Sequence, residues 1–337
     1  MRKLYLITGG TGHLGRHVIR LLRKNKDNHI RVLALPGDPS PLPDGVERVE
    51  GDVCDAQSLQ RFFQTDGYDS ITLFHLAAYI TIASKNDPRV WNVNVEGTRN
   101  VMALALRTGV DRVVYVSSVH AIPELPSPDV ITETTRFSAE SVHGQYAKSK
   151  AAAAELVLQY AARGLNVSIV HPSGIIGPGD TQKSNHMTRT IEAMASGRIP
   201  VSISGGYDFV DVRDVAAGII RCEAKGKAGE CYILSGHFAT VAGLMRIISG
   251  FTGRRFLSLH IPRFVMKAAA YLGEKFSLLL RRVPLFTPYS LFTLYSNALF
   301  SHRKATQNLG YRPRSLRRTV RSVLQSLGYG NKIKHIP

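Results

Sequence analysis

The sequence contains few cysteines and few acidic side chains. Its three cysteines, Cys54, Cys222 and Cys231, are too few and too scattered along 337 residues for a disulfide framework or a metal cluster. We therefore expect no metal site and interpret the thiols as small apolar side chains of the core. The 25 acidic residues stand against 43 lysines and arginines, which gives a formal net charge of +18.

Acidic residues are missing altogether from the C-terminal part of the chain. No Asp or Glu follows Glu274, whereas residues 275–337 hold twelve Lys and Arg. No nucleic-acid-binding motif accompanies this charge, so we expect no nucleic-acid partner. Two interpretations stay open: a solvated basic surface, or a peripheral surface that is attracted to an anionic membrane or an acidic partner.

The sequence also lacks a signal peptide and a membrane span. Met1-Arg2-Lys3 leads directly into an apolar run, which predicts a cytoplasmic protein. The segment from Val283 to Ser301 is apolar and uncharged, but it contains Pro284, Pro288 and several polar residues. We therefore expect this segment to cover an apolar substrate pocket.

The stretch from Lys3 to Asn25 combines a strand, a glycine turn and a helix. An apolar run, Leu4 to Ile7, is typical of a strand buried on both faces. Glycines follow at a spacing of three, and apolar residues then repeat at helical period; the glycines are Gly9, Gly12 and Gly15, and the helical positions are Leu14, Val18, Leu21 and Leu22. This order predicts a dinucleotide site, because the turn lets backbone N–H groups approach a pyrophosphate at the helix N-terminus.

Strands and helices alternate through the following residues. We expect strands at Ile30 to Leu35, Val46 to Glu50, Ile71 to Leu76, Val113 to Val116 and Leu165 to Val170, with helices at Pro88 to Arg107 and Gln145 to Ala162. Alternation of this kind predicts an α/β fold with a doubly wound parallel sheet. Beyond it we expect a loop at 173–180, a helix at Met187 to Ser196, a strand and helix at Phe209 to Ala217, a strand at Cys231 to Leu234, and mostly helices from Phe238 onward.

The same pattern predicts two domains. Residues 1–172 would form a dinucleotide-binding domain, to which residues 208–236 return. Residues 173–207 and 237–330 would form a smaller, mostly helical substrate domain.

Tyr146 and Lys150 are the strongest candidates for chemistry. They lie four residues apart in a predicted helix and therefore share one face. An ammonium beside a phenol lowers the phenol's pKa from about 10, so that the tyrosine can exchange a proton with an alcohol or ketone oxygen. Ser118, at the end of a predicted strand, could hold the same oxygen. Tyr271 and Lys275 have the same spacing in a different setting, so the spacing alone is weak evidence.

Taken together, the motifs resemble those of an extended short-chain dehydrogenase/reductase, a member of the NAD-dependent epimerase/dehydratase superfamily. The resemblance covers nearly the whole chain and is carried by Thr8–Gly15, Gly51–Val53, His75–Ala78, Asn94–Thr98, Val116–Ser118, Tyr146–Lys150, Pro172–Gly179, Asp211–Ala216 and Leu309–Pro313. It implies a Rossmann fold and an NAD(P) cofactor.

The resemblance also implies roles for individual residues. Tyr146 would be the general acid/base, Lys150 would lower its pKa and bind the nicotinamide ribose, Ser118 would orient the reacting oxygen, and Asn94 would support the lysine. The implied cofactor-binding residues are Gly9, Thr11, Gly12, His13, Leu14, Gly15, Asp52, Val53, Leu76, Ala77, Ala78, Tyr146, Lys150, Pro172, Gly174 and Ile175.

Two positions depart from the family pattern. Leu35, followed by Pro36, stands where the family usually has an acid or an arginine that selects NAD or NADP, and Asp38 comes three residues later. The choice between the two cofactors therefore stays open. His171 stands where the family usually has an arginine before the proline, which we expect to affect local packing.

Within the family we favour an oxidoreductase that interconverts a secondary alcohol and a ketone on a bulky, lipophilic substrate. The pattern is closest to the 3β-hydroxysteroid dehydrogenase and dihydroflavonol 4-reductase group. Nucleotide-sugar epimerases and dehydratases, the first alternative, usually carry an arginine where this chain has Tyr207. A cofactor-binding sensor or scaffold without turnover is the second alternative.

Residues just beyond strand ends are candidates for substrate contact: Ile80, Thr81, His120, Ser173, Gly174, Asn185 and His186. The resemblance further implies a homodimer through a four-helix contact, to which Val93 to Ala105 would contribute one helix.

Overall fold

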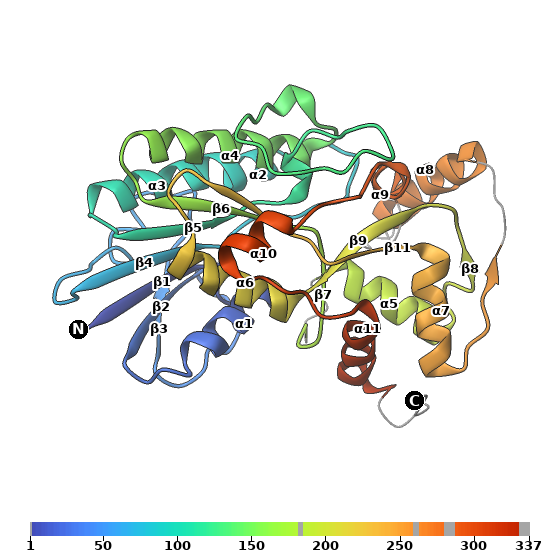
Figure 1. The fold of residues 1–337 in the computed structure, drawn as a ribbon, viewed down its shortest axis with the longest axis horizontal. Coiled ribbons are helices and arrows are strands. Elements are labelled where there is room, and N and C mark those ends of the chain that lie inside the picture. The colour runs from blue at the N-terminus through green and yellow to red at the C-terminus, as the bar shows by residue number, and fades with distance from the viewer. Residues whose placement is uncertain (1, 181–184, 259–262, 280–286, 330–337) are drawn as a thin grey trace.

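The computed structural model describes residues 2–180, 185–258, 263–279 and 287–329. Its centre is a seven-stranded parallel sheet in the order β10-β6-β5-β4-β1-β2-β3 (Figure 1). The strands are β1 (Lys3–Thr8), β2 (Asn28–Ala34), β3 (Val46–Glu50), β4 (Ser70–His75), β5 (Arg112–Val116), β6 (Val167–Pro172) and β10 (Cys231–Leu234). The predicted doubly wound sheet is confirmed.

The sheet is buried because helices cover both of its faces. Alternate residues of β1 show this directly, since Leu4 and Leu6 pack into one apolar core while Tyr5 and Ile7 pack into another. The first core is closed by α3 (Gly97–Arg107) and α4 (Gln145–Ala162), and the second by α1 (His13–Leu22), α6 (Val212–Lys225) and α10 (Arg303–Leu309). Cys222 and Cys231 are buried in these cores, whereas Cys54 is half-buried.

The strand order reverses between β1 and β4. The chain runs outward from β1 through β2 to β3 and then returns to β4 on the other side of β1. Ligands of open parallel sheets bind at such a reversal, beyond the carboxyl ends of the strands. The glycine turn follows β1 at this edge.

The predicted helix from Pro88 to Arg107 is interrupted. It consists of α2 (Pro88–Trp91), a π-helical turn η1 (Asn92–Glu96) and α3. The wider turn contains Asn94, whose side chain is buried. Hydrophobic periodicity predicted a single helix, because Val93, Gly97, Val101 and Leu104 recur at intervals of three to four residues across the turn.

A second, smaller region lies beyond the carboxyl edge of the main sheet. Its three-stranded sheet has the order β11-β9-β7, with β7 (Gly174–Ile176), β9 (Gly206–Asp211) and β11 (His237–Thr240). The expectation of a plain loop at 173–180 is wrong at β7, which is held by its pairing with β9. β8 (Val201–Ser202) and β12 (Leu257–Ser258) form a short parallel pair.

Helices complete the smaller region. α5 (His186–Ser196), α7 (Val241–Thr252) and α11 (Leu316–Leu324) enclose a third apolar core, and short turns complete the chain at η2 (Val119–Ala121), η3 (Ala139–Ser141) and η4 (Gln325–Tyr329). α8 (Arg263–Leu279) and α9 (Pro288–Tyr295) lie together at one end of the molecule (Figure 1). None of the helices in the described ranges is long and apolar enough to cross a membrane.

Candidate active site

The glycine turn forms a tight cradle between β1 and α1. Gly9 has φ +70°, and a Cβ there would lie 2.8 Å from the Ala77 nitrogen at the end of β4. A Cβ on Gly15 would lie 2.3 Å from the Gly9 oxygen. Both positions therefore require glycine, and Gly12 caps α1 without any side-chain hydrogen bond to its first N–H groups. The first N–H groups of α1 have no side-chain partner in the described part of the chain, and the glycines leave room for a ligand to come close to the backbone. Such a helix start fits the pyrophosphate of a dinucleotide.

The segment after β6 closes over this turn. The imidazoles of His13 and His17 each lie 3.0 Å from the Pro178 oxygen through Nε2. Burial lowers the pKa of His17, and the second imidazole disfavours its charge further. The Nδ1 of His13 is buried without a hydrogen-bond partner. Pro172, Gly174 and Ile175, which are predicted to touch the cofactor, belong to the segment that these side chains join to the glycine turn.

Other predicted cofactor residues occupy the same edge of the sheet. Val53 packs against Gly97 of α3, where a Cβ would approach its side chain to 2.7 Å. The Asp52 carboxylate accepts a hydrogen bond from the Cys54 N–H at 2.9 Å, which fixes the turn after β3. The Ala77 N–H donates a hydrogen bond to the Thr8 hydroxyl at 3.2 Å. The residues present therefore fit a dinucleotide lying across β1, β3 and β4; their roles in binding it stay predictions.

Asp38, whose role in choosing between NAD and NADP the sequence left open, lies beside the glycine turn. The chain reverses at Gly37, which has φ +74°, and the Asp38 N–H donates to the Leu35 oxygen at 3.0 Å. Hydrogen bonds with Ser40 and with Thr11 of the glycine turn lower the pKa of the Asp38 carboxyl. An anionic carboxylate therefore lies beside the turn although its position in the sequence is late. The Pro36-Gly37 turn signal could have indicated it.

Ser118 and Tyr146 form a buried hydroxyl pair. Ser118 caps the short turn η2, and its Oγ accepts a hydrogen bond from the His120 N–H at 3.2 Å. Burial raises the pKa of Tyr146 to about 12, and the hydrogen bond with Ser118 acts in the opposite direction. The Tyr146 phenol is thus protonated at neutral pH, whereas the sequence pattern predicted an acidified one.

Lys150 is fully enclosed, one turn of α4 beyond Tyr146. Its ammonium donates to the Tyr115 hydroxyl at 3.1 Å and to the Val116 oxygen at 2.8 Å, both on β5. Its Nζ also lies 4.7 Å from the centre of the Tyr115 ring. Burial lowers the pKa of Lys150 to about 7. Tyr115 could not be recognised from the sequence, because a tyrosine inside a buried strand resembles an ordinary core residue.

The π-helical turn positions Asn94 behind these residues. The Asn94 amide donates to the Ser149 hydroxyl at 2.9 Å and to the Tyr79 oxygen at 3.1 Å, and its carbonyl accepts the Tyr79 N–H at 2.8 Å. The Ser149 hydroxyl in turn donates to the backbone carbonyl oxygen of Tyr146 at 2.8 Å. Asn94 therefore connects α4 to the loop that follows β4.

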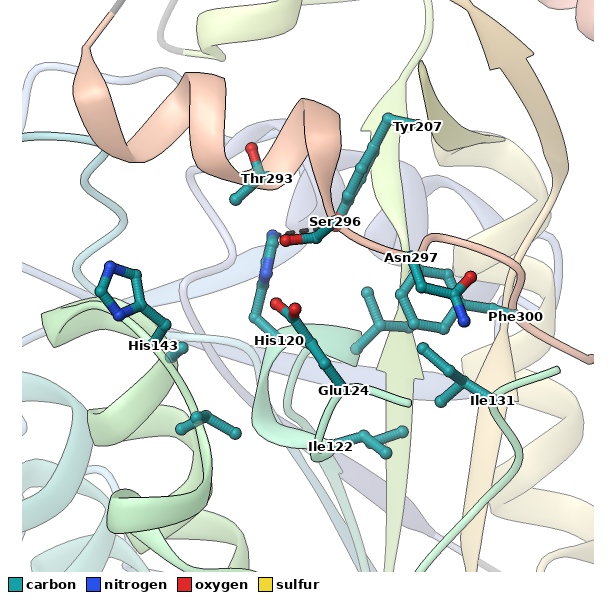
Figure 2. Close-up of a pocket in the computed structure, with 13 residues that line it drawn as sticks. His120, Ile122, Glu124, Ile131, His143, Tyr207, Thr293, Ser296, Asn297 and Phe300 are labelled. Carbon is teal, nitrogen blue, oxygen red and sulfur yellow. Dashed lines mark hydrogen bonds between the residues drawn. The ribbon is translucent and has the colours of Figure 1, made fainter. Parts of the chain in front are cut away.

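A pocket opens between η2, the first turn of α4 and α9 (Figure 2). The walls are mostly apolar or aromatic, with a few hydroxyl and amide groups from the end of α9. The lining residues are Val119, His120, Ile122, Glu124, Ile131, Val142, His143, Ala147, Tyr207, Thr293, Ser296, Asn297 and Phe300. Thr293 to Phe300 belong to the segment predicted to cover such a pocket; residues 283–286 of that segment lie outside the described residues.

His120 and Tyr207 form the polar wall of the pocket. The Tyr207 hydroxyl and the His120 Nε2 are 2.8 Å apart, and the two rings stack with centroids 5.7 Å apart (Figure 2). The His120 ring lies 6.2 Å from the Tyr146 ring, which places this pair next to the candidate proton donor. Burial lowers the pKa of His120 to about 4, so its imidazole is neutral at physiological pH.

The other predicted substrate contacts lie elsewhere. The Ser173 hydroxyl donates to Asp208, and Asn185 caps α5 by accepting the Met187 N–H at 2.8 Å. Ile80 is exposed, and Thr81 accepts the Ala83 N–H at 3.0 Å within its own loop. Of the predicted contacts, His120 is the one found in this pocket; Gly174 and His186 also lie outside its lining.

A family model described as the NAD dependent epimerase/dehydratase family matches residues 5–234 of this chain. The chain is 33% identical to sterol demethylase protein B of Methylococcus capsulatus, over 93% of this chain and 94% of that protein. It is 29% identical to a putative dihydroflavonol 4-reductase of Synechocystis, over 98% and 96%. It is 27% identical to mouse 3 beta-hydroxysteroid dehydrogenase type 7, over 92% and 91%.

A solved structure agrees with these relatives. The crystal structure of gox2253 superposes with a TM-score of 0.81 at 30% identity and covers 99% of this chain and 100% of its own. The likeness therefore extends through the smaller, C-terminal region as well as the main sheet.

Proposed function

The chain belongs to the NAD-dependent epimerase/dehydratase family, and within that family we propose an oxidoreductase that interconverts a secondary alcohol and a ketone on a bulky, lipophilic substrate. As a family member the protein is an NAD-dependent enzyme with a small-molecule substrate. The substrate class and the residues that act on it are the proposal.

The composition of the pocket beside Tyr146 carries the proposal. Among the described residues that line the pocket, Glu124 is the one acidic side chain, and neither lysine nor arginine contributes. A nucleoside diphosphate would need cations there, because its phosphates must be paired when they leave water. A neutral molecule with an apolar body and a few hydroxyl or carbonyl groups meets matching groups instead.

The names of three relatives are consistent with this class. This chain aligns over more than nine-tenths of its length with proteins named as a sterol demethylase, a 3 beta-hydroxysteroid dehydrogenase and a putative dihydroflavonol 4-reductase. Tyr207 stands where sugar-nucleotide enzymes usually have an arginine, and its hydroxyl is hydrogen-bonded to His120. These observations favour an alcohol/ketone oxidoreductase over a nucleotide-sugar epimerase.

The mechanism assigns the proton to Tyr146. When bound, NAD supplies the acceptor or donor of hydride for the substrate carbon. During reduction Tyr146, protonated at neutral pH, gives its proton to the ketone oxygen and becomes a phenolate; during oxidation the phenolate form takes the proton of the alcohol. The Ser118 hydroxyl, oriented by the His120 N–H, holds the same oxygen.

Lys150 and Asn94 act behind the reacting groups. Lys150 is anchored by Tyr115 and Val116, so that its position relative to α4 and β5 is fixed. Asn94 holds the loop after β4 against α4. We propose that both orient Tyr146 and the ribose of the cofactor. The predicted residues of the glycine turn would hold the pyrophosphate.

A paired substitution tests this assignment. We expect Tyr146→Phe to lower kcat at least about 100-fold on a steroid or flavonoid ketone, because a positioned proton donor is lost. Tyr271→Phe is the matched control, since Tyr271 also precedes a lysine by four residues but is half-exposed on α8. Activity would be followed by nicotinamide absorbance with steroid, flavonoid and nucleotide-sugar substrates and with both nicotinamide cofactors.

Three outcomes separate the alternatives. Equal activity of Tyr146→Phe and the parent enzyme would refute the catalytic assignment. Turnover of nucleotide sugars without net change in absorbance would support an epimerase. Cofactor binding without turnover of any substrate would support a sensor or scaffold.

Partners and location are separate proposals. The implied homodimer would use the Val93 to Ala105 segment, but Val101 and Leu104 of its apolar face are already buried in the core. Exposed positions such as Arg99 and Ala103 would have to form the contact, which sedimentation velocity can check. A cytoplasmic location with peripheral membrane contact stays a prediction, tested by fractionating cells.

A further inference from the structure

Helix α8 exposes four large apolar side chains. Phe264 is 75% exposed, Val265 42%, Tyr271 51% and Leu272 65%. Their spacing of one, seven and eight residues places them on one side of the helix. We name these four residues the α8 apolar face. Apolar side chains gathered in this way on a protein surface usually mark a binding site.

The opposite side of α8 is attached to the protein. Ala270 and Glu274 are buried, and the Glu274 carboxylate accepts the Ser84 N–H at 2.8 Å. The helix also packs against α9. These contacts fix the rotation of α8, so that the α8 apolar face is turned away from the part of the molecule to which the helix is attached.

The charges around the α8 apolar face are of one sign. Lys267 and Lys275 are exposed, and the Lys275 ammonium lies 4.6 Å over the Tyr271 ring. Glu274, the acidic residue of α8, is buried and accepts a hydrogen bond from the Ser84 N–H. The exposed part of this helix therefore combines apolar, aromatic and cationic side chains without an opposing carboxylate.

We propose that α8 docks the protein onto an anionic lipid surface. A helix of this kind lies in the plane of the bilayer interface, with apolar side chains among the acyl chains and lysines at the headgroups. A second copy of this chain fits less well, because a two-fold contact through the α8 apolar face would bring the Lys267 and Lys275 pairs of both copies together.

This membrane contact lies on α8 rather than on the basic C-terminal region, where the sequence predicted it. Within the basic region, Arg314 pairs with Asp214 at 2.9 Å and Lys304 with Glu230 at 2.5 Å, so these cations are used in the fold. α11 lies away from α8 in Figure 1. Arg281, Arg282, Lys332 and Lys334 lie outside the described residues.

Docking through α8 would place the pocket beside the bilayer. α9, against which α8 packs, supplies Thr293 to the pocket, and the Thr287 hydroxyl before α9 donates to the Ile82 oxygen at 2.6 Å. A lipophilic substrate dissolved in the membrane would then have a short route to the site. This use of the surface rests on the proposed function, whereas docking itself does not.

Flotation with vesicles tests the docking directly. The purified full chain would be mixed with phosphatidylcholine vesicles, with or without phosphatidylglycerol, and the floated protein measured. We expect the parent to bind the anionic vesicles more strongly than the neutral ones. The F264S/L272S variant should bind about tenfold less or weaker still, because two apolar side chains no longer enter the bilayer. K267E/K275E should lose the preference for anionic vesicles.

The matched control changes apolar residues of similar exposure elsewhere. Leu35 is 57% and Val130 56% exposed, and L35S/V130S should float as the parent does. Circular dichroism verifies folding, and turnover of a water-soluble secondary alcohol should be equal in F264S/L272S and the parent. Failure of the proposed function would abolish that turnover in every variant and leave flotation unchanged, so the two proposals fail separately.

Three results would overturn the docking proposal. They are a parent that does not float with anionic vesicles, equal flotation of F264S/L272S and the parent, or a dimer in solution that F264S/L272S converts to a monomer. The last result would show that the α8 apolar face joins two copies of the chain.

Discussion

Replacing Lys150 by methionine should remove a pH-dependent penalty on the stability of the folded protein while damaging its activity. The lysine is fully enclosed, and burial lowers its pKa from an ordinary value of 10.5 to about 7. The unfolded chain therefore binds a proton more readily than the folded chain at every pH between these values. Methionine, of similar length, carries no such penalty.

The sign of the pH dependence follows from this depressed pKa. As the pH falls from 10.5 to 7, the lysine becomes protonated in the unfolded chain but not in the folded one, so the folded state loses stability. Below pH 7 both states are protonated and the penalty is constant. Between pH 7 and pH 9.5 the penalty should shrink by about 3 kcal/mol, at 1.36 kcal/mol per unit of pKa.

Loss of the hydrogen bonds of Lys150 lowers the free energy of unfolding of Lys150→Met by an amount that does not depend on pH. Tyr115 and Val116 each lose a donor, which costs roughly 1–3 kcal/mol per buried group. Burial raises the pKa of Tyr115, so its hydroxyl stays protonated over this range and the cost does not change with pH. The absolute stability of Lys150→Met thus depends on opposing effects, whereas its pH dependence comes from the ammonium alone.

Urea unfolding of both proteins between pH 6 and pH 10 measures this difference. All other titrating groups are the same in the two proteins, so they cancel when the free energies of unfolding are subtracted. The parent should gain about 3 kcal/mol relative to Lys150→Met between pH 7 and pH 9.5. A difference that stays flat with pH would mean that Lys150 keeps an ordinary pKa in the folded protein, and the reasoning would be refuted.

Three further substitutions, with a fourth as a control, probe the cofactor cradle and the pocket. Asp38→Asn should raise the ratio of kcat/KM for NADP over NAD roughly tenfold, since a carboxylate beside the glycine turn would repel a 2′-phosphate; an unchanged ratio would exclude Asp38 from cofactor selection. Gly15→Ala should lower the melting temperature and abolish its rise with NAD, because the new methyl group meets the Gly9 oxygen, whereas Gly273→Ala, in open space on α8, should stabilise by up to about 1 kcal/mol. Tyr207→Phe should lower kcat/KM for a ketone roughly tenfold with an unchanged KM for NAD; equal loss for both would indicate general damage.

The main sheet was predictable because its signals are local. β3, α4 and β10 begin and end at the residues that periodicity predicts, since buried parallel strands and long amphipathic helices carry their pattern within a few residues. β7 was not predictable, because three residues in a Gly- and Pro-rich segment become a strand through pairing with β9, far along the chain.

The candidate site was predictable by residue type but not by contacts. Ser118, Tyr146 and Lys150 gather at one edge of the sheet as the motifs indicate, with Asn94 behind them. The partner of Lys150 is Tyr115, which belongs to a different strand, and a contact between distant segments leaves no local pattern. The return of Asp38 to Thr11 likewise depends on how the turn after β2 folds back.

Deuterium transfer tests the central claim most directly. Reduced NAD in which deuterium replaces both hydrogens of the reactive nicotinamide carbon would be incubated with a steroid or flavonoid ketone and either the parent or Tyr146→Phe, and the product examined by mass spectrometry. An oxidoreductase of the proposed kind delivers one deuterium to the new carbinol carbon, with the variant at least about 100-fold slower. An alcohol product without deuterium, or equal rates for the two proteins, would contradict the account.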